Sequence, residues 1–277
     1  MIVNYRRQCL IVVSLAGLAG ACTPGPPEDL DLGAFDYRTV AWPACDASRR
    51  AGPAGRSDDE TLDPATKYSV RTPANYNESV RHPLIVVYAP AGHNRFASEA
   101  FVGLTPAATR AGFIVTYVDS RRLSLPAIKR LSRVAGAVRK KWCIDGSRVY
   151  LTGHSDGGTI ANAMAFLPDI PFRPRAIAPS AAGIRAADMS SEECREPLAV
   201  MTLQNDDDEL FPNYGGEVAA WWARCNACSN ETKRINDACH EYIDCAEDGE
   251  TVICTNPGNH RNWPEFNEKI LEFFKRT

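Results

Sequence analysis

The chain has 277 residues, of which 44% are hydrophobic and 23% are charged. This length and composition are typical of one large α/β domain or two small ones with a sizeable core. The formal net charge of -3 and the absence of a basic stripe give no reason to expect a nucleic acid as partner.

Residues 1–21 are predicted to be a signal peptide rather than part of the fold. Arg6 and Arg7 precede an apolar run that ends in small residues, and this run is too short to span a bilayer comfortably. Cys22 follows directly, as in bacterial lipoprotein signals, where that cysteine carries a lipid; simple cleavage nearby is the alternative. We therefore expect an exported protein, and a lipid on Cys22 would tether it to a membrane surface.

Eight cysteines remain in the mature chain after Cys9 and Cys22 are set aside. They are Cys45, Cys143, Cys194, Cys225, Cys228, Cys239, Cys245 and Cys254. An even count in an exported chain predicts up to four disulfides, with a stapled, loop-rich excursion over 225–254. A zinc site that includes Cys225, Cys228 and His240 is an alternative that the spacing favours less.

Regular structure is predicted to begin after a long polar stretch. The proline-rich, acidic residues 23–35 are typical of a tether within an N-terminal segment over 22–45, and residues 46–64 are typical of a surface loop. Residues 68–72 predict an edge strand. Continuous apolar runs of the kind found in buried parallel strands occur at 84–89, 113–118, 149–152, 176–178, 198–203 and 251–255.

Helical patterns lie between these runs. Apolar residues recur at steps of three or four over 125–142, and further helices are predicted over 213–224 and 264–275, the last with Pro264 in its first turn. This alternation predicts an α/β fold with a doubly wound, mostly parallel sheet in one domain over 46–277. Ligands of such sheets bind beyond the carboxyl ends of the strands.

The segment that specifies both structure and chemistry is residues 148–160. An apolar strand runs into Gly-His-Ser-Asp-Gly at 153–157 and then into a helical pattern. This context predicts a nucleophile elbow in which Ser155 is exposed above the sheet and the following helix directs amides toward negative charge there. The alternative is a glycine-rich strand-to-helix loop that carries an ordinary serine.

A serine hydroxyl needs a base, a group that orients the base, and oxyanion donors. In this topology the acid and then the histidine follow the serine in the chain. His260 lies in a loop beyond an apolar strand and is the predicted base; His240, in the cysteine-dense segment, is the alternative. The acid is expected within 206–209, where four consecutive carboxylates leave the choice open, as does the alternative of a solvated loop or a calcium site.

The predicted oxyanion donors are the amide of Asp156 and one amide from the loop after residue 89. Pro90 has no amide, so Ala91 is the first candidate and Gly92 the second. The residues expected at the substrate site are Trp263, His154 and Gly92.

At this point the chain resembles a known group. Residues 143–158 read Cys-Ile-Asp-Gly-Ser-Arg-Val-Tyr-Leu-Thr-Gly-His-Ser-Asp-Gly-Gly, 208–216 read Asp-Glu-Leu-Phe-Pro-Asn-Tyr-Gly-Gly, and 260–264 read His-Arg-Asn-Trp-Pro. These motifs are similar to those of secreted α/β-hydrolases that include polyhydroxybutyrate depolymerase-like proteins and feruloyl or acetylxylan esterases. The resemblance covers roughly 66–275. It implies the α/β-hydrolase fold, Asp208 as the acid, and a bridge between Cys228 and Cys245.

The chain is therefore expected to be an exported serine esterase that works through an acyl-enzyme with no cofactor and no metal, and the resemblance implies polyester, feruloyl or acetyl polysaccharide esters as its substrates. Its expected partner is an ester-bearing polymer or oligomer. A serine peptidase on the same fold, or a non-catalytic carbohydrate- or polymer-binding relative, is the alternative. The chain departs from the group at 89–90, where Ala-Pro replaces His-Gly, and at 204–207, where Gln-Asn-Asp-Asp replaces His-Gly-Thr-Ala.

Overall fold

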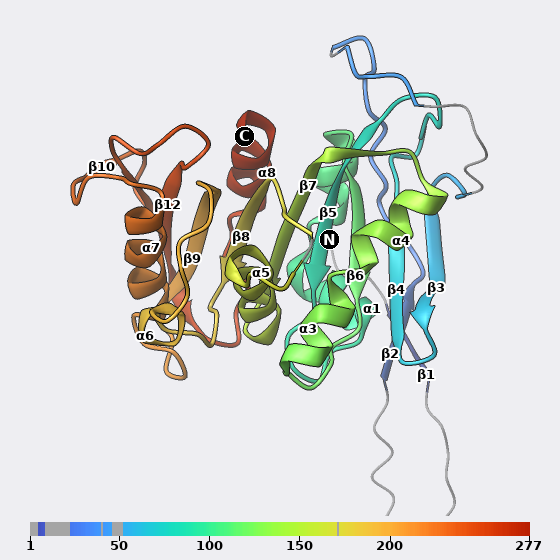
Figure 1. Cartoon of the computed structure of the whole chain (residues 1–277). Helices are drawn as coiled ribbons and strands as arrows, with labels where there is room; N and C mark the ends of the chain where they lie inside the picture. Colours follow the sequence, from blue (N-terminus) through green and yellow to red (C-terminus); the bar gives the residue numbers. More distant parts are fainter. Residues whose placement is uncertain (1–4, 9–22, 40, 46–51, 171) are drawn as a thin grey trace, which may run out of the picture.

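The structure is a computed structural model that describes residues 5–8, 23–39, 41–45, 52–170 and 172–277 (Figure 1). Most of the predicted signal peptide, including its apolar run, lies outside the described residues, as does the predicted lipid-bearing Cys22. Among the helices that the structure describes, none has the length and apolar character needed to cross a membrane.

A ten-stranded sheet forms the centre of the fold. Its strands are β3 (Arg56–Asp63), β4 (Thr66–Arg71), β5 (His82–Tyr88), β6 (Ile114–Val118), β7 (Ile144–His154), β8 (Ala176–Ser180), β9 (Ala199–Asp207), β10 (Thr232–Arg234), β11 (Cys239–Tyr242) and β12 (Thr251–Asn259). Their order is β10-β11-β12-β9-β8-β7-β5-β6-β4-β3, and the run from β12 to β6 is parallel throughout. The predicted mostly parallel sheet is therefore confirmed.

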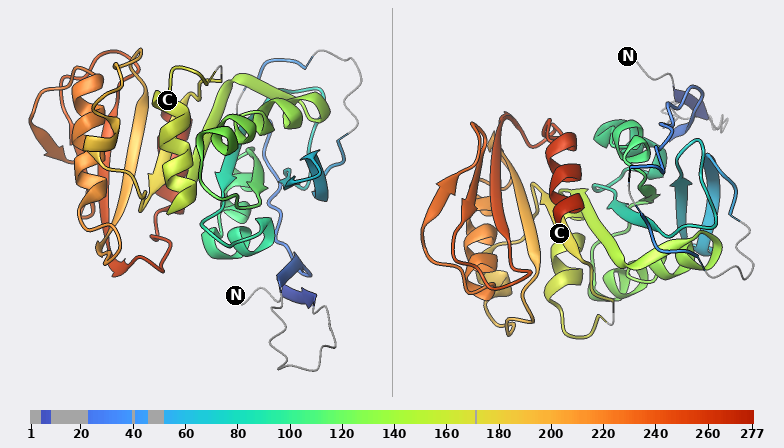
Figure 2. Two further views of the ribbon diagram at one scale, coloured as in Figure 1. Left: turned by 60° about the horizontal axis from the view of Figure 1, so that its bottom comes forward. Right: turned by 90° about the horizontal axis from the view of Figure 1, so that it is seen from above.

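Helices cover both faces of this sheet (Figure 2). They are α1 (Arg95–Val102), α2 (Thr105–Arg110), α3 (Leu125–Leu131), α4 (Val134–Lys141), α5 (Asp156–Phe166), α6 (Ala186–Met189), α7 (Tyr214–Cys225) and α8 (Asn267–Arg276). In β5, Leu84 and Val86 join one core with α3, α4, α5 and α7, whereas Ile85 and Val87 join the other with α1, α2 and α8. A strand buried on both faces is hydrophobic throughout, which explains the continuous apolar runs.

The predicted edge strand and the predicted loop before it are both corrected by the structure. β4 is paired on both sides, with β6 and with β3, and the edge belongs to β3 within the supposed loop over 46–64. β3 reads Arg-Ser-Asp-Asp-Glu-Thr-Leu-Asp, and its residues are exposed or half-exposed. Its polar sequence hides the strand from a search for apolar runs, although charged residues are what an exposed sheet edge requires.

Two predicted helices also differ from the structure. The single helix over 125–142 is broken at Ser132, whose hydroxyl donates to the carbonyl of Lys129, so that α3 and α4 are separate. Such local side-chain bonds compete with the helical pattern. The last helix begins at Asn267 rather than near Pro264, because the amide of Phe266 donates to the carbonyl of Pro264 in a preceding turn.

The N-terminal segment is packed on the domain rather than free, which corrects the predicted tether over 23–35. β2 (Thr23–Pro27) pairs with β1 (Tyr5–Gln8) and contacts α1. The carbonyl of Pro24 accepts from the side chain of Asn94 at 2.8 Å, the amide of Gly33 donates to Thr109, and Phe35 is buried. Proline has no backbone N–H to donate, but its carbonyl oxygen still accepts hydrogen bonds. A proline-rich segment can therefore be bound by hydrogen-bond donors of the domain.

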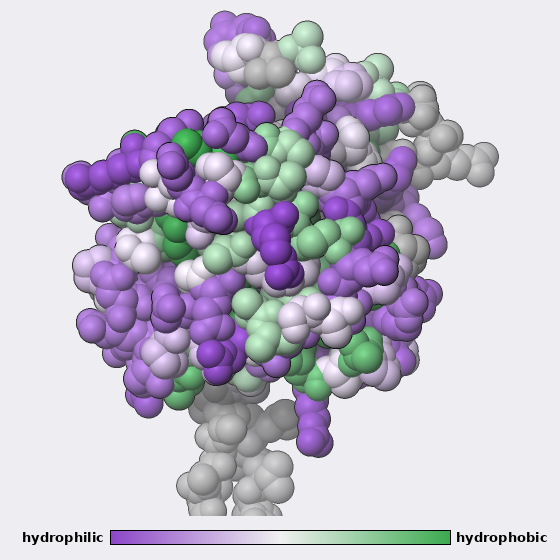
Figure 3. All heavy atoms as spheres, turned by 60° about the vertical axis from the view of Figure 1, so that its left-hand side comes forward, coloured by the Kyte–Doolittle hydropathy of each residue, from purple (hydrophilic) through white to green (hydrophobic). Residues whose placement is uncertain are grey.

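Four disulfides join the eight cysteines from Cys45 onward, and no cysteine of the described residues is free. They are Cys45–Cys143, Cys194–Cys225, Cys228–Cys245 and Cys239–Cys254. With every sulfur bonded, the cysteines of the predicted excursion are not available as zinc ligands. The excursion itself adds β10 and β11 as antiparallel strands beyond β12. Figure 3 shows that this end of the molecule presents mostly hydrophilic residues.

Candidate active site

Ser155 lies on a tight turn between β7 and α5. Its backbone has φ 55° and ψ -118°, a conformation that a non-glycine residue adopts only when its surroundings enforce it. The surroundings here are close: a Cβ at Gly153 or Gly157 would lie 2.5 or 2.0 Å from the carbonyl oxygen of Tyr88. The amide of Ser155 donates to the carbonyl of Ser180 at 3.0 Å, which fixes the turn against β8.

The structure brings Ser155, His260 and Asp208 together. The hydroxyl oxygen of Ser155 is 3.0 Å from Nε2 of His260, and Nδ1 of His260 is 2.9 Å from Oδ2 of Asp208. Asp208 directly follows β9 and His260 directly follows β12, and these two strands are parallel neighbours. His240, the alternative base, lies in β11 with an exposed side chain.

The environment of Asp208 distinguishes it from the carboxylates beside it. Its side chain is fully buried, and its second oxygen accepts from the amides of Leu210 at 3.0 Å and Phe211 at 2.9 Å. Asp206 and Asp207 are exposed at the end of β9. Because an ionised carboxylate only accepts, Nδ1 of His260 carries the hydrogen of their bond, and Nε2 is left as an acceptor toward Ser155.

The segment that carries His260 is held by Asn205, which the sequence did not single out, and by Glu209, one of the four candidate acids. Nδ2 of Asn205, which is buried, donates to the carbonyls of Asn259 at 2.9 Å and Asn262 at 2.8 Å. Glu209 accepts from the amide of His260 at 3.3 Å, and backbone hydrogen bonds lower the pKa of Glu209. The only sequence signal for Asn205 is its place in the stretch over 204–207, where the chain departs from the group it resembles.

His154 does not line a substrate surface, which corrects its predicted role. It is only 2% exposed, and its ring is bonded on both sides, to the carbonyl of His260 at 2.7 Å and to the hydroxyl of Ser180 at 3.0 Å. Burial lowers the pKa of His154 to about 4. Side chains alternate along a strand, so this last residue of β7 is directed away from the solvent that Ser155 faces.

The predicted oxyanion donors lie at the start of α5 and in the turn that follows β5. Asp156 is the first residue of α5, and amides in a first helical turn have no partner within the helix. Ala91 and Gly92 are exposed in a turn beyond β5, closed by a bond from the amide of His93 to the carbonyl of Pro90. Gly92, the third residue of this four-residue turn, has φ 77°. A type II turn requires a positive φ at that position, which glycine adopts readily. Their roles as donors remain predictions.

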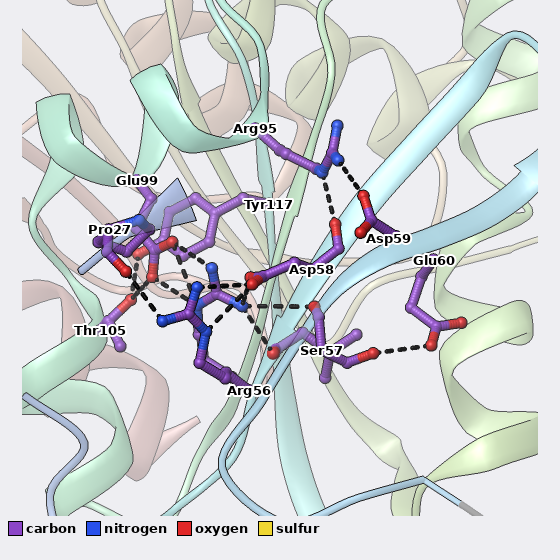
Figure 4. Close-up of polar contacts among 12 residues, drawn as sticks. Pro27, Arg56, Ser57, Asp58, Asp59, Glu60, Arg95, Glu99, Thr105 and Tyr117 are labelled. Carbon is purple, nitrogen blue, oxygen red and sulfur yellow. Dashed lines mark hydrogen bonds and ion pairs between the residues drawn. The ribbon is translucent and has the colours of Figure 1, made fainter. Parts of the chain in front are cut away.

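A cluster of charged residues fixes α1, which starts directly after this turn. Arg95 donates to the carbonyl of Asp58 and pairs with the carboxylate of Asp59, and these bonds are visible in Figure 4. Deeper in, Glu99 accepts from Thr105 and pairs with the fully buried Arg71 at 2.7 Å. The predicted oxyanion loop is therefore followed by a helix that is anchored to β3 and β4.

Trp263 lies beside the candidate site and is half-buried. Its Nε1 donates to Asn267 at 2.9 Å, and its ring is 6.4 Å from that of Phe101. Trp263 and Phe101 border a cavity of about 580 Å³. The substrate role of Trp263 stays a prediction. Phe211, which the sequence did not single out, packs edge-on against the ring of His260 at 4.9 Å.

The acidic run over 206–209 does not form a cation site. Within the part of the chain that the structure describes, no group of three or more histidine, cysteine, aspartate or glutamate side chains is arranged to hold a metal ion. Asp208 is bonded to His260, and Glu209 accepts from the amide of His260, so two of the four carboxylates already have other partners.

Comparisons with known proteins place the fold. No family model matches the sequence. The chain is 23% identical to feruloyl esterase B of Piromyces equi over 229 residues, which is 70% of this chain and 42% of that protein. The chain thus spans less than half the length of this relative.

The chain is also similar to solved structures of esterases. The acetyl xylan esterase from Aspergillus awamori superposes with a TM-score of 0.61 at 16% identity, over 82% of this chain and 100% of the other. A truncated carbohydrate esterase from gut microbiota gives a TM-score of 0.58 at 12% identity, over 84% and 98%. These likenesses show that the chain has the predicted α/β-hydrolase fold.

Proposed function

We propose that this protein is a serine esterase that hydrolyses carboxylic esters through an acyl-enzyme. The observation that carries the proposal is the continuous set of contacts from Asp208 through His260 to Ser155, at 2.9 and 3.0 Å. Nucleophile, base and orienting acid in this order are the parts that acyl transfer by a serine requires. The likeness to feruloyl, acetyl xylan and carbohydrate esterases supports an ester as the substrate.

In this mechanism the Ser155 hydroxyl attacks the ester carbonyl while Nε2 of His260 takes its proton. The amides of Asp156 and Ala91 would bind the oxyanion, and such a donor contributes about 3 kcal/mol to transition-state stability. His260 then gives the proton to the departing alcohol, and a water molecule activated by His260 releases the acid. Asp208 holds the imidazole in the required tautomer and stabilises its charged form.

We further propose that the substrate is an ester-bearing polysaccharide, oligosaccharide or polyester, and that the protein acts outside the cytoplasm. The four disulfides support an oxidising compartment. Cys22 would serve as the lipid attachment site, which would hold the enzyme on a membrane surface.

Replacement of Ser155 by alanine tests the proposal. The variant should hydrolyse p-nitrophenyl esters about a million-fold more slowly than the wild type, because the triad acts as a unit. Its melting temperature should match that of the wild type, and a fluorophosphonate probe should label the wild type only. Activity within tenfold of the wild type would refute the assignment. Cleavage of peptide amides at rates comparable to esters would instead favour a peptidase.

A further inference from the structure

A second set of contacts, separate from the catalytic one, joins the backbone of Ser155 to that of His260. It starts at Ser180, the last residue of β8. The carbonyl of Ser180 accepts from the amide of Ser155 at 3.0 Å, and its hydroxyl lies 3.0 Å from Nδ1 of His154. On the other side of the ring, Nε2 of His154 lies 2.7 Å from the carbonyl oxygen of His260.

The donors and acceptors in this set can be in only one arrangement. A carbonyl oxygen accepts, so Nε2 of His154 carries the hydrogen that it donates to His260. Nδ1 is then an acceptor, and the hydroxyl of Ser180 donates to it. Both side chains are nearly inaccessible to solvent, at 2% and 1% exposure, and burial keeps the His154 ring neutral by lowering its pKa. Water therefore cannot replace these bonds.

The end of β12, which leads directly into His260, receives support from outside the sheet through this bond. The pairing of β12 with β9 is irregular between Asn256 and Asn259, and Gly258 has φ 140°. The sheet pairing is thus interrupted just before the base and resumes only at Asn259, which pairs with Asp207. The His154 ring also packs at 5.1 Å from the His260 ring and at 5.1 Å from Phe101, which fills the space beneath the loop.

We propose that His154 is a positioning residue for the reaction, which sets the distance between the His260 imidazole and the Ser155 hydroxyl by tying both backbones to Ser180. This proposal rests on the proposed esterase function. A misplacement of about 1 Å in a catalytic group can cost about 100-fold in rate, so the effect of losing the tie is measurable. His154 touches no reacting atom and acts only through the loop that it holds.

Substitution of His154 by glutamine or by asparagine tests its two hydrogen bonds one at a time. The amide nitrogen of a glutamine reaches about as far as Nε2, whereas an asparagine ends near Nδ1. His154→Gln can keep the bond to the carbonyl of His260, and His154→Asn can keep only the contact with Ser180. For His154→Asn we expect kcat for a p-nitrophenyl ester to fall about 100-fold with KM changed less than about threefold. His154→Gln should recover at least about tenfold of that loss.

Ser180→Ala is a third variant that keeps the backbone carbonyl holding Ser155 and removes only the hydroxyl, so it tests the tie even where His154→Asn does not fold. Loss of this buried hydrogen bond should lower kcat about tenfold. Melting temperatures are measured for all three, and Ser155→Ala gives the background rate. If Ser155→Ala is inactive but His154→Asn and Ser180→Ala match the wild type, the positioning role is wrong and the triad stands. Equal kcat losses in the Asn and Gln variants would also overturn it. An active Ser155→Ala would instead remove the proposed function itself.

Discussion

The carbonyl oxygen of Tyr88 lies so close to Gly157 that a Cβ at residue 157 would be 2.0 Å from it. Tyr88 ends β5, and the turn with the predicted oxyanion donor Ala91 follows three residues later. Gly157 is in the first turn of α5, two residues after Ser155. This one contact therefore sets how near the predicted oxyanion loop comes to the nucleophile.

Replacement of Gly157 by alanine should lower both the proposed esterase activity and the stability of the fold. The new methyl group meets backbone rather than a flexible side chain, so β5 or α5 must shift. We expect kcat/KM for p-nitrophenyl esters to fall at least about 100-fold and stability to drop by about 1–3 kcal/mol. Gly136→Ala is the matched control, because nothing lies within 4 Å of a Cβ there and α4 should gain about 0.5–1 kcal/mol. Wild-type kinetics for Gly157→Ala would contradict the close contact.

Asp208→Asn should separate geometry from electrostatics in the triad. The asparagine keeps the size of the side chain, but it can present its amide nitrogen to His260 and so favour the wrong imidazole tautomer. We expect kcat to fall about 10⁴-fold, as for other triads of this kind. Asp207→Asn, one residue earlier on an exposed side chain, is the control. Equal effects of the two changes on kcat would mean that the acid has been misassigned.

The buried His154 predicts how stability depends on pH. Its pKa is lowered by burial from 6.5 to about 4, so between these values the unfolded chain binds a proton that the folded chain does not. Stability should therefore fall as the pH falls from 6.5 toward 4, by about 3 kcal/mol from this group. Urea unfolding at pH 7 and pH 4 measures the loss, and in His154→Gln the loss should be about 3 kcal/mol smaller. An unchanged pH dependence in that variant would show that His154 titrates normally.

The ion pair between Arg71 and Glu99 should be far more sensitive than pairs on the surface. Arg71 has a fully buried side chain, and Arg71→Met would leave the Glu99 carboxylate buried without this cation. We expect a loss of about 3–5 kcal/mol in the free energy of unfolding. Arg38→Ala breaks an exposed pair with Asp36 and should leave the free energy of unfolding essentially unchanged. Denaturation midpoints of the two variants, compared with the wild type, measure the contrast.

Patterns of apolar residues predicted the parts of the fold that are buried on both sides. The run at 84–89 and the run at 198–203 became β5 and β9 because a doubly covered parallel strand has no polar face to interrupt it. The sequence did not predict β3, because it is a polar edge strand without an apolar run. Its pairing with β4 is visible only in the three-dimensional structure.

The residues of the candidate site likewise divide into those that the sequence predicts and those that only the structure reveals. Ser155 and His260 were found from local context, since the chemistry requires their residue types at the ends of strands. Asp208 was chosen among four carboxylates only by resemblance, because spacing does not reveal which one is buried against His260. His154 and Asn205 act on the backbone of a loop more than 50 residues away, and no sequence pattern records such a contact.

The bond between Pro24 and Asn94 has a consequence for how the molecule is presented to its surroundings. Asn94 lies between the turn after β5 and helix α1, so β2 is bound to the domain beside the predicted oxyanion donors. Any attachment made upstream of Thr23 would therefore hold the protein from this side of the domain. The predicted oxyanion donors would then stay close to the surface to which the chain is fixed, because the point of attachment and this turn are neighbours in the structure.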